Sequence, residues 1–235
     1  MAGCTPMGGT AFSTEALLWP FNEQEKKHAP REIYLAGNAD LLRAGPCVAI
    51  VGSRQASAQG LDRARKLAAL LVQQNVIVVS GLAAGIDTAA HETAIQCGGR
   101  TIAVLGTPLN ECFPAQNALL QQRIMREHLA VSQFAPGTAV GKHTFPMRNR
   151  TMALIADATV IIEANDQSGT INLGWEALRL GRPLWIAASM FSRPGVTFPE
   201  KLGFYGAEAL TDETLPRLLS LLPEGRRDAP AELPF

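Results

Sequence analysis

The chain has 235 residues, of which 47% are hydrophobic and 18% are charged, and it carries 21 Lys and Arg against 21 Asp and Glu. This length and apolar content indicate a globular protein with a substantial core. The balanced charge excludes the global basic field that drives indiscriminate nucleic-acid binding, so any anion binding must be local.

Short β-branched apolar runs alternate with segments of helical periodicity through most of the chain. The expected strands are 47–51, 76–80, 101–106, 129–132, 158–163 and 183–189, and the expected helices are 59–74, a stretch from about Asp87, 115–127 and 169–180. Alternating strands and helices predict βαβ units, and near-continuous Val, Ile and Leu runs predict strands buried on both faces. We therefore predict an α/β fold: a doubly wound, mainly parallel, Rossmann-like sheet in a single domain.

Three regions follow from this pattern. Residues 1–45 form an N-terminal extension with room for one further strand or helix, and residues 46–222 form the Rossmann-like domain. Residues 223–235 are rich in proline and charge, which predicts a disordered tail.

The cysteines are scattered and form no CxxC pair, which predicts reduced thiols rather than disulfides or metal ligands. They are Cys4, Cys47, Cys97 and Cys112. No segment approaches the roughly 18 unbroken apolar residues of a membrane span, and the first residues lack a basic stretch followed by an apolar one. We expect a soluble, cytoplasmic protein with no membrane segment, metal or cofactor.

Glycine-containing turns follow several of the predicted strands. They read GSR (52–54), SGLAAGID (80–87), LGT (105–107), SQFAPG (132–137) and EANDQSGT (163–170). The carboxyl ends of parallel strands share one edge of the sheet, where glycine lets the backbone approach a ligand and helix N-termini favour phosphate. Any one of these turns is more simply an ordinary βα turn, but together they indicate an anion-binding crevice.

Two common phosphate-binding motifs do not fit these turns. Dinucleotide binding requires G-x-G-x-x-G after the first strand, and here Arg54 stands at the place of the second glycine. The run PGTAVGKHT comes near a P-loop, but Gly137 and Gly141 are one residue too close and His143 replaces the hydroxyl residue.

Cations gather near one predicted edge of the sheet. Residues 121–155 contain five Lys and Arg against one acid. Lys142, Arg148 and Arg150 in this segment, together with Arg54 after the first strand, would place four cations around the crevice.

Phe145 lies among these cations, in what we expect to be a loop built on a phenylalanine–proline turn. Cations that follow phosphates beside an aromatic ring that meets a base are typical of single-stranded nucleic-acid binding. The alternative is that Phe145–Pro146 pins the loop onto the core, and the sequence leaves both open.

The motifs taken together resemble the DNA-processing protein A family (DprA, also called Smf), over its Rossmann-like domain only. They are VAIVGSR (48–54), VVSGLAAGID with AAH (78–91), GGRTIAVLGTPLNECFPAQN (98–117), FPMRNR (145–150), VIIEANDQSGT (160–170) and GRPLWIAAS (181–189). The resemblance covers about residues 30–215. It departs from the family at Gln133, where a glutamate is usual.

This resemblance implies a sequence-independent binder of single-stranded DNA with no enzymatic step. It also implies protection of DNA in natural transformation or recombination, loading of the RecA recombinase, and a homodimer formed through the Rossmann-like domain. The expected DNA-binding residues are Gly52, Ser53, Arg54, Ser80, Gly81, Lys142, Phe145, Arg148, Asn149, Arg150, Ser168, Gly169 and Thr170. No catalytic residue is expected.

Two alternatives use the same crevice. One is a sensor that binds a small nucleotide, and the other is a nucleoside-monophosphate phosphoribohydrolase of a related Rossmann-like family. The glutamates of that enzyme family fall here on Asn172 and Leu173, and Glu176 lies nearly a turn further on. Glu163 ends a strand on the correct edge, but we expect a structural acid that binds backbone amides or an arginine.

Asp87 and His91 lie four residues apart on a predicted helix, where they would share one face. A metal site would need further ligands at useful spacing, so we favour Asp87 as the helix N-cap. Trp175, Leu178 and Trp185 are expected in the core.

Overall fold

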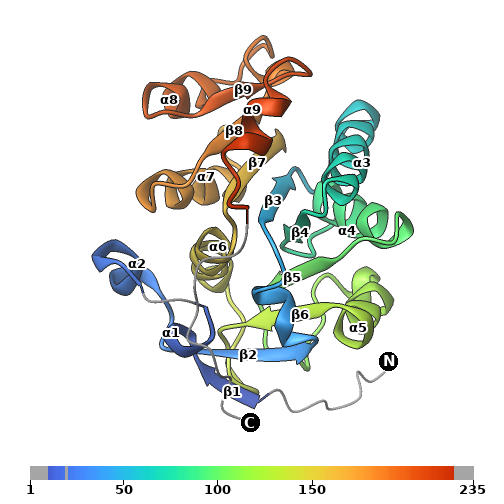
Figure 1. The fold of residues 1–235 in the computed structure, drawn as a ribbon, viewed down its shortest axis with the longest axis vertical. Coiled ribbons are helices and arrows are strands. Elements are labelled where there is room, and N and C mark those ends of the chain that lie inside the picture. Colours follow the sequence, from blue (N-terminus) through green and yellow to red (C-terminus); the bar gives the residue numbers. More distant parts are fainter. Residues whose placement is uncertain (1–9, 19–20, 225–235) are drawn as a thin grey trace.

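The computed structural model describes residues 10–18 and 21–224. The structure is a mixed α/β domain whose sheet has nine strands within the described residues, in the order β1-β2-β6-β5-β4-β3-β7-β8-β9 (Figure 1). The strands are β1 (Thr10–Ser13), β2 (Glu32–Gly37), β3 (Cys47–Gly52), β4 (Ile77–Ser80), β5 (Thr101–Leu105), β6 (Leu129–Ser132), β7 (Ala158–Glu163), β8 (Leu184–Ala187) and β9 (Glu208–Leu210). The predicted α/β class and mainly parallel sheet are confirmed.

Helices cover both faces of this sheet. The α-helices are α1 (Thr14–Leu17), α2 (Glu23–His28), α3 (Ala58–Gln73), α4 (Ile86–Gln96), α5 (Ala118–Glu127), α6 (Thr144–Ile155), α7 (Gly169–Arg179), α8 (Phe198–Phe204) and α9 (Leu215–Ser220). Short 3-10 helices are η1 (Ala39–Leu42), η2 (Ala115–Asn117) and η3 (Ala188–Met190). Helices α3, α4 and α5 lie on one side of the sheet, and α6 and α7 lie on the other (Figure 1).

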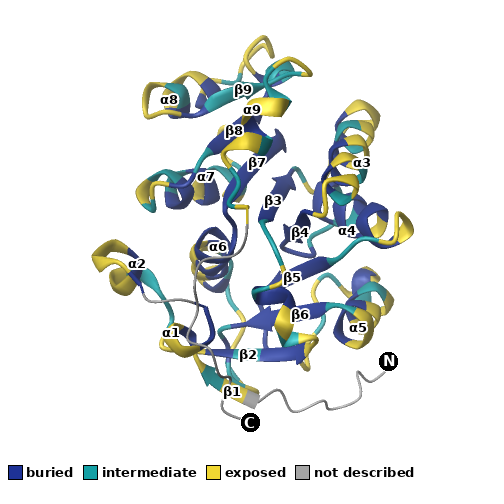
Figure 2. Ribbon diagram, in the orientation of Figure 1, coloured by how far each residue is buried: buried dark blue, intermediate teal, exposed yellow. Residues whose placement is uncertain are grey.

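The central strands are buried on both faces, as their apolar runs predict (Figure 2). Alternate side chains of β3 enter different cores: Val48 and Ile50 pack with α3 and α4, whereas Ala49 and Val51 pack with α6 and α7. This period of two is the ordinary geometry of a strand. Trp185 on β8 is buried as predicted.

The remaining two core predictions are met less completely. Trp175 and Leu178, both on α7, are only partly buried and pack against the α6 side of the core. Within the described residues no helix is long and apolar enough to cross a membrane.

Part of the predicted N-terminal extension is continuous with the sheet. Strand β2 pairs antiparallel with β6, with Gly37 opposite Leu129, and β1 pairs antiparallel with β2. The extension therefore contributes two antiparallel strands at one end of the sheet, with β1 at the edge, where the sequence left room for one strand or helix. Most of the predicted disordered tail, residues 225–235, lies outside the described residues.

A buried ion pair ties α2 to the turn before β8. Arg182 Nη2 donates to Glu25 Oε1 at 2.8 Å, and both side chains are 3% exposed. The other Glu25 oxygen accepts the Asn22 N–H at 2.9 Å, which completes a capping box for α2. The same carboxylate thus caps its own helix and neutralises a buried cation.

We predict that Glu25→Ala lowers the free energy of unfolding by about 3–5 kcal/mol, because it leaves the Arg182 charge buried without this partner. Urea denaturation followed by circular dichroism measures the change. The matched control is Glu23→Ala, in an exposed pair with Lys26 at 3.5 Å, which we expect to change stability by less than about 0.5 kcal/mol. Equal effects of the two substitutions would contradict a structural role for the buried pair.

Candidate nucleic-acid interface

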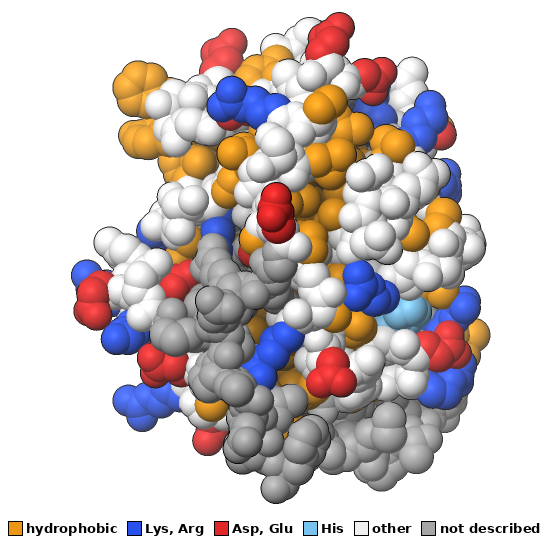
Figure 3. Space-filling view, viewed as in Figure 1, with side chains coloured by type: hydrophobic (Ala, Val, Ile, Leu, Met, Phe, Trp, Pro, Cys, Tyr) orange, Lys and Arg blue, Asp and Glu red, His pale blue; other side chains and the backbone are white. Residues whose placement is uncertain are grey.

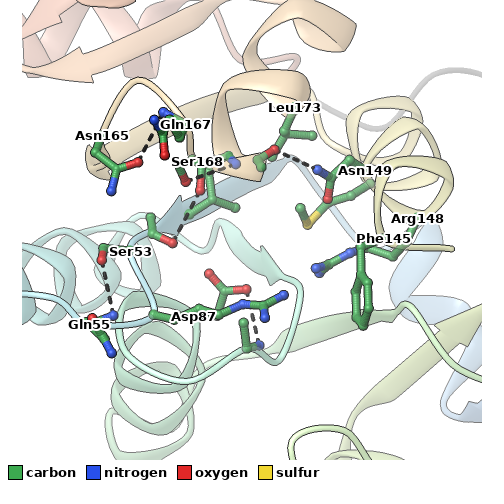
Figure 4. Close-up of a pocket in the computed structure, with 17 residues that line it drawn as sticks. Ser53, Gln55, Asp87, Phe145, Arg148, Asn149, Asn165, Gln167, Ser168 and Leu173 are labelled. Atoms are coloured by element: carbon green, nitrogen blue, oxygen red, sulfur yellow. Dashed lines mark hydrogen bonds between the residues drawn. The ribbon is translucent and has the colours of Figure 1, made fainter. Parts of the chain in front are cut away.

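A cleft of about 470 Å³ opens at the carboxyl ends of β3 and β7. The chain runs outward from β3 through β4, β5 and β6 and then returns to place β7 beside β3, so the strand order reverses at this point. Such reversals are where α/β sheets bind ligands. The lining residues are Val51, Gly52, Ser53, Arg54, Gln55, Ala83, Asp87, Phe145, Arg148, Asn149, Met152, Asn165, Gln167, Ser168, Gly169, Thr170 and Leu173 (Figure 4).

The turn after β3 is shaped by a close approach at Gly52. A Cβ atom at this position would lie 2.6 Å from Cγ1 of Ile86 and 2.8 Å from the carbonyl oxygen of Glu163, so a side chain does not fit. The Ser53 N–H donates to that same carbonyl at 2.6 Å, and Ser53 Oγ accepts the Gln55 N–H at 3.1 Å. Ser53 was expected among the DNA-binding residues, and it lines the cleft, but its amide already has a partner and is not available to a phosphate.

Ser80 and Gly81 lie beneath the cleft rather than on its surface. Ser80 is fully buried and its hydroxyl donates to the Ile50 carbonyl at 2.7 Å. The Gly81 N–H donates to Asp87 Oδ2 at 3.1 Å. Both residues support the site, and neither offers a free donor to a ligand in the way the sequence suggested.

Arg54 extends over two aromatic rings at the mouth of the cleft. Its guanidinium carbon lies 5.4 Å from the centre of the Phe145 ring and 6.0 Å from that of Phe113, within cation–π range. The two ring centres are 5.4 Å apart, with planes tilted by 49°. Arg54 and Phe145 thus line the cleft together, and the Phe113 ring lies beside them.

Phe145 lies in the first turn of α6, so the predicted loop is wrong. Proline is tolerated in the first turn of a helix, where its missing N–H would be unpaired anyway, and Pro146 lies there. The Phe145 ring also packs against Gly106, where a Cβ atom would come within 2.7 Å of Cδ1. Phe145 is therefore packed against the end of β5 and also faces the cleft.

Arg148 forms the floor of the cleft, and its side chain is directed from α6 toward the centre (Figure 4). The residue is 6% exposed, and Nη1 donates to the Val104 carbonyl at 3.2 Å. Its guanidinium lies against Gly81, where any side chain would collide with it. Burial lowers the pKa of Arg148, and the nearby Asp87 carboxylate opposes that shift.

Asp87 balances this buried cation. Its Oδ2 accepts the N–H groups of Gly81 at 3.1 Å and Ala83 at 3.3 Å. Burial raises the pKa of Asp87, whereas the Arg148 charge and the two amides lower it. The predicted N-cap role is wrong, since Gly85 is the N-cap of α4 and Asp87 instead holds the preceding turn.

The opposite wall is the N-terminus of α7. Ser168 caps this helix by accepting the Thr170 N–H at 3.2 Å, and Thr170 Oγ1 donates to the Gly52 carbonyl at 3.3 Å. Asn149 Nδ2 donates to the Gly169 carbonyl at 3.0 Å, which joins α6 to α7. A helix N-terminus of this kind favours an anion.

Two of the four predicted cations lie away from the cleft lining. Arg150 Nε donates to Glu176 Oε1 at 3.1 Å, and the same carboxylate also pairs with Arg179 at 2.9 Å. Lys142 is exposed on the turn before α6 and does not line the cleft. The structure therefore brings together Arg54 and Arg148, with Lys142 outside the cleft lining and Arg150 neutralised.

Several lining residues were not among those predicted from the sequence. Gln55, Asn165 and Gln167 line the cleft, with Asp87 at its floor. The clearest omission is Phe113, which lies beside it and contacts both Arg54 and Phe145. An aromatic residue before a proline in a turn after a strand could have signalled it.

Glu163 is a structural acid, as predicted. Its carboxylate accepts the Ser57 hydroxyl at 2.6 Å and the Ser57 N–H at 3.2 Å, and it pairs with Arg193 at 3.3 Å. Burial alone would raise its pKa, but the hydrogen bonds from Ser57 and the Arg193 charge hold the pKa below the usual value.

His91 is buried behind the cleft floor. Its Nδ1 lies 2.7 Å from Thr101 Oγ1, and that hydroxyl donates to the Val78 carbonyl at 2.8 Å. The hydroxyl proton is thus in use, so His91 carries its own proton on Nδ1 and donates it. Over the described part of the chain no three His, Cys, Asp or Glu side chains gather as a metal site would require.

The fold and the cleft define a Rossmann-like α/β protein whose crevice is lined by two arginines, a phenylalanine and a helix N-terminus. The chain belongs to the DNA recombination-mediator protein A family, whose sequence pattern matches residues 11–214. It is 41% identical over 175 residues to DNA processing protein DprA of Streptococcus pneumoniae, covering 74% of this chain and 61% of that protein. It is 32% identical over 184 residues to Protein Smf of Escherichia coli, covering 78% of this chain and 49% of that protein.

Solved structures agree with this assignment. The crystal structure of DprA from Streptococcus pneumoniae superposes with a TM-score of 0.80 at 34% identity, over 92% of this chain and 75% of that one. The structure reported for the single-stranded DNA binding mode of DNA processing protein A from Helicobacter pylori superposes with a TM-score of 0.75 at 23% identity, over 86% and 94% of the two chains. At this identity, the similarity to the Helicobacter pylori protein shows a shared fold.

We predict that His91 makes the folded state sensitive to acid. Burial, with the nearby charges of His128 and Arg148, lowers its pKa from 6.5 to about 3. In the unfolded chain His91 therefore binds a proton near pH 6.5, whereas in the folded chain it binds one only near pH 3. Stability falls as pH falls through this window, with a slope of up to about 1.4 kcal/mol per pH unit from this residue.

Urea denaturation at several pH values between 6 and 4.5 measures this slope. In His91→Gln the pH dependence should be shallower than in the wild type, because one titrating group is gone. The exposed His143 provides the control, and His143→Gln should retain the wild-type slope. Parallel curves for wild type and His91→Gln would show that this histidine is not responsible.

Proposed function

We propose that this chain binds single-stranded DNA without sequence preference, through the cleft at the ends of β3 and β7. The observation that carries the proposal is the wall in which Arg54 lies over Phe113 and Phe145. Basic grooves with aromatic side chains are the usual way to hold a single strand, because every base has a face that can stack. Membership in a family of DNA recombination mediators supports the same proposal.

Phosphate recognition would come from two directions in this proposal. Arg54 lies at the mouth of the cleft and Arg148 forms its floor. The N-terminal turn of α7 faces them from the opposite wall, with Gly169 open to approach because no atom lies within 4 Å of a Cβ position there. An arginine and a helix N-terminus that face the same space suit one phosphate group.

We propose further that the chain performs no hydrolysis. Glycosidic cleavage needs a carboxylate free to act on water or on the leaving group. The candidate carboxylates at or near the cleft all have partners. Asp87 accepts a backbone amide, Glu163 accepts the Ser57 hydroxyl, and Glu176 pairs with Arg150. Incubation with nucleoside monophosphates should accordingly release no free base.

A small-nucleotide sensor is the second candidate. The cleft volume of about 470 Å³ falls within the usual range for small-ligand sites, and its polar side chains Asn165 and Gln167 suit a base or sugar. A free nucleotide would use the same arginine and helix terminus as a strand. Binding to strands and to mononucleotides must therefore be compared directly.

The biological role that we propose is DNA protection or processing during transformation or recombination, in the cytoplasm, with delivery of the strand to RecA. Family membership supports this role. The chain spans 61% of the length of the Streptococcus pneumoniae relative and 40% of the Mycobacterium tuberculosis relatives. The activities of those longer proteins are therefore proposals for this chain.

We predict that Arg54→Ala weakens binding of single-stranded DNA and lowers the slope of log affinity against log salt by about 0.7, the share of one phosphate contact. Fluorescence anisotropy of a labelled oligonucleotide across a salt series measures both quantities, with a duplex of the same sequence beside it. Arg150→Ala should have a smaller effect, because Glu176 already pairs with Arg150.

The control for Arg54→Ala is Arg217→Ala, an exposed arginine paired with Glu208 near β9. Wild-type binding to duplex and single strand with equal affinity would contradict the proposed preference. An absence of binding to any strand at low salt would favour the sensor, and nucleoside phosphates would then be titrated against the protein.

We also propose a homodimer, for which an exposed aromatic cluster at one end of the sheet offers a surface. Phe204 is 86% exposed and Tyr205 63% exposed, and Tyr205 packs edge-to-face on Phe204 at 5.3 Å and on Trp175 at 5.0 Å. Hydrophobic side chains gather on this end of the molecule, near α8 (Figure 3). Exposed aromatic clusters of this kind are enriched in protein interfaces.

We predict that the double substitution Phe204→Ala/Tyr205→Ala shifts the protein from dimer to monomer in size-exclusion chromatography with light scattering. The physical reason is the loss of the two most exposed rings of the cluster. Leu119→Ala, at an 80% exposed leucine on α5, should leave the mass unchanged. A wild-type protein that is monomeric at every concentration would refute the homodimer.

A further inference from the structure

Phe113 is an aromatic residue on the turn between β5 and α5, and 49% of its surface is exposed. Exposed apolar residues are common and need no function by themselves. Phe113, however, is held in place: its ring contacts Phe145 at a centroid distance of 5.4 Å, and the Arg54 guanidinium lies 6.0 Å from its centre. Half of a positioned ring is thus left facing solvent.

A second hollow, of about 70 Å³, lies beside this ring. Its lining includes Phe113, Phe145, Arg54, Arg148, Gly81 and Gly106. Arg54, Phe145, Ala83 and Arg148 line both this hollow and the main cleft, so the two spaces meet along one shared wall. A ligand that extends from the cleft over Arg54 and Phe145 would next meet Phe113.

The shared wall contains a buried polar group with unused capacity. Arg148 is more than nine-tenths buried, and its Nε atom has no hydrogen-bond partner among the described residues. A buried donor left without a partner is costly, and sites of this kind are commonly completed by a ligand or water. Arg148 is therefore a buried cation shared by the cleft and the hollow, with one donor that no group of the described residues satisfies.

We propose that Phe113 is a second base-stacking position, so that the interface holds two successive nucleotides of a single strand. One base occupies the main cleft beside Phe145, and the next stacks on the exposed part of Phe113. Arg54, which lies over both rings, meets the phosphate that joins the two nucleotides. This inference rests on the proposed function and adds to it a site size and a residue.

The proposal separates this site from a mononucleotide pocket. A single nucleotide can occupy the cleft but does not extend to Phe113, so it gains nothing from that ring. A dinucleotide or longer strand gains a stacking interaction, for which alanine substitutions at comparable sites give roughly 5- to 100-fold losses in affinity. Because stacking uses the face of any base, this gain requires no particular sequence.

The test compares two strands of equal length and charge: oligothymidylate and a strand of abasic deoxyribose phosphates. We expect Phe113→Ala to weaken binding of oligothymidylate by roughly 5- to 100-fold and to leave binding of the abasic strand unchanged. Phe113→Trp should restore binding of oligothymidylate, since a larger ring stacks at least as well. Leu119→Ala removes an exposed apolar side chain of the same segment and is the matched control.

The outcomes are distinguishable. Equal losses on both strands would mean that Phe113 acts only by holding Arg54, and an unchanged affinity for oligothymidylate would remove Phe113 from the site, so either result overturns the proposal. If the wild type itself binds neither strand at low salt, the proposed function fails, and this is seen before any variant is made. Thermal melting of Phe113→Ala is the control for folding, and we expect a melting temperature close to that of the wild type.

Discussion

The close approach of three chain segments at Gly52 is the constraint on which the cleft depends. The end of β3 passes so near Ile86 on α4 and the Glu163 carbonyl on β7 that only a glycine fits between them. The Ser53 N–H then bonds to that carbonyl, and Thr170 of α7 donates to the Gly52 carbonyl. Three segments far apart in sequence are thereby fixed around one turn, and the space beside that turn is the cleft.

A buried cation, Arg148, forms the floor of the cleft. Arg148 is held against Gly81 and the Val104 carbonyl, with the Asp87 carboxylate nearby to balance its charge. A buried, balanced cation costs less than an isolated one, and Arg148 still lines the cleft. Arg54, by contrast, lies at the mouth over two rings and is free to meet a phosphate. The two arginines therefore differ in exposure and in surroundings although they line the same space.

Family membership and site geometry give different kinds of information about this chain. The match over residues 11–214 establishes the family. The geometry adds how this chain would hold a strand: phosphate at an arginine and a helix N-terminus, and bases against a pair of phenylalanines. The carboxylates nearest the cleft are bound to amides, a hydroxyl or arginines, and an acid held in this way is poorly placed to move a proton.

Local pattern in the sequence was enough to predict the class of fold and the place of the site. Near-continuous apolar strands, helices of period 3.6 and glycine at the strand exits are local features, and parallel topology brings those exits to one edge. The strands β3 to β8 and a crevice on the carboxyl edge follow from them, whereas the position of the cleft between β3 and β7 does not. Gly52, Arg54, Phe145 and Asn149 were each predicted and do line the cleft.

What only the tertiary structure decided are the contacts between segments distant in sequence. The sequence places Arg148 and Arg150 two residues apart, and this separation of about half a helical turn on α6 directs Arg148 to the cleft floor and Arg150 to Glu176 on α7. Phe113 joins the site only because the turn after β5 folds against α6, and β2 joins the sheet only by pairing with β6. Sequence pattern records which face of its own element a residue occupies, whereas its partner depends on how the elements pack, and packing is a property of the whole chain.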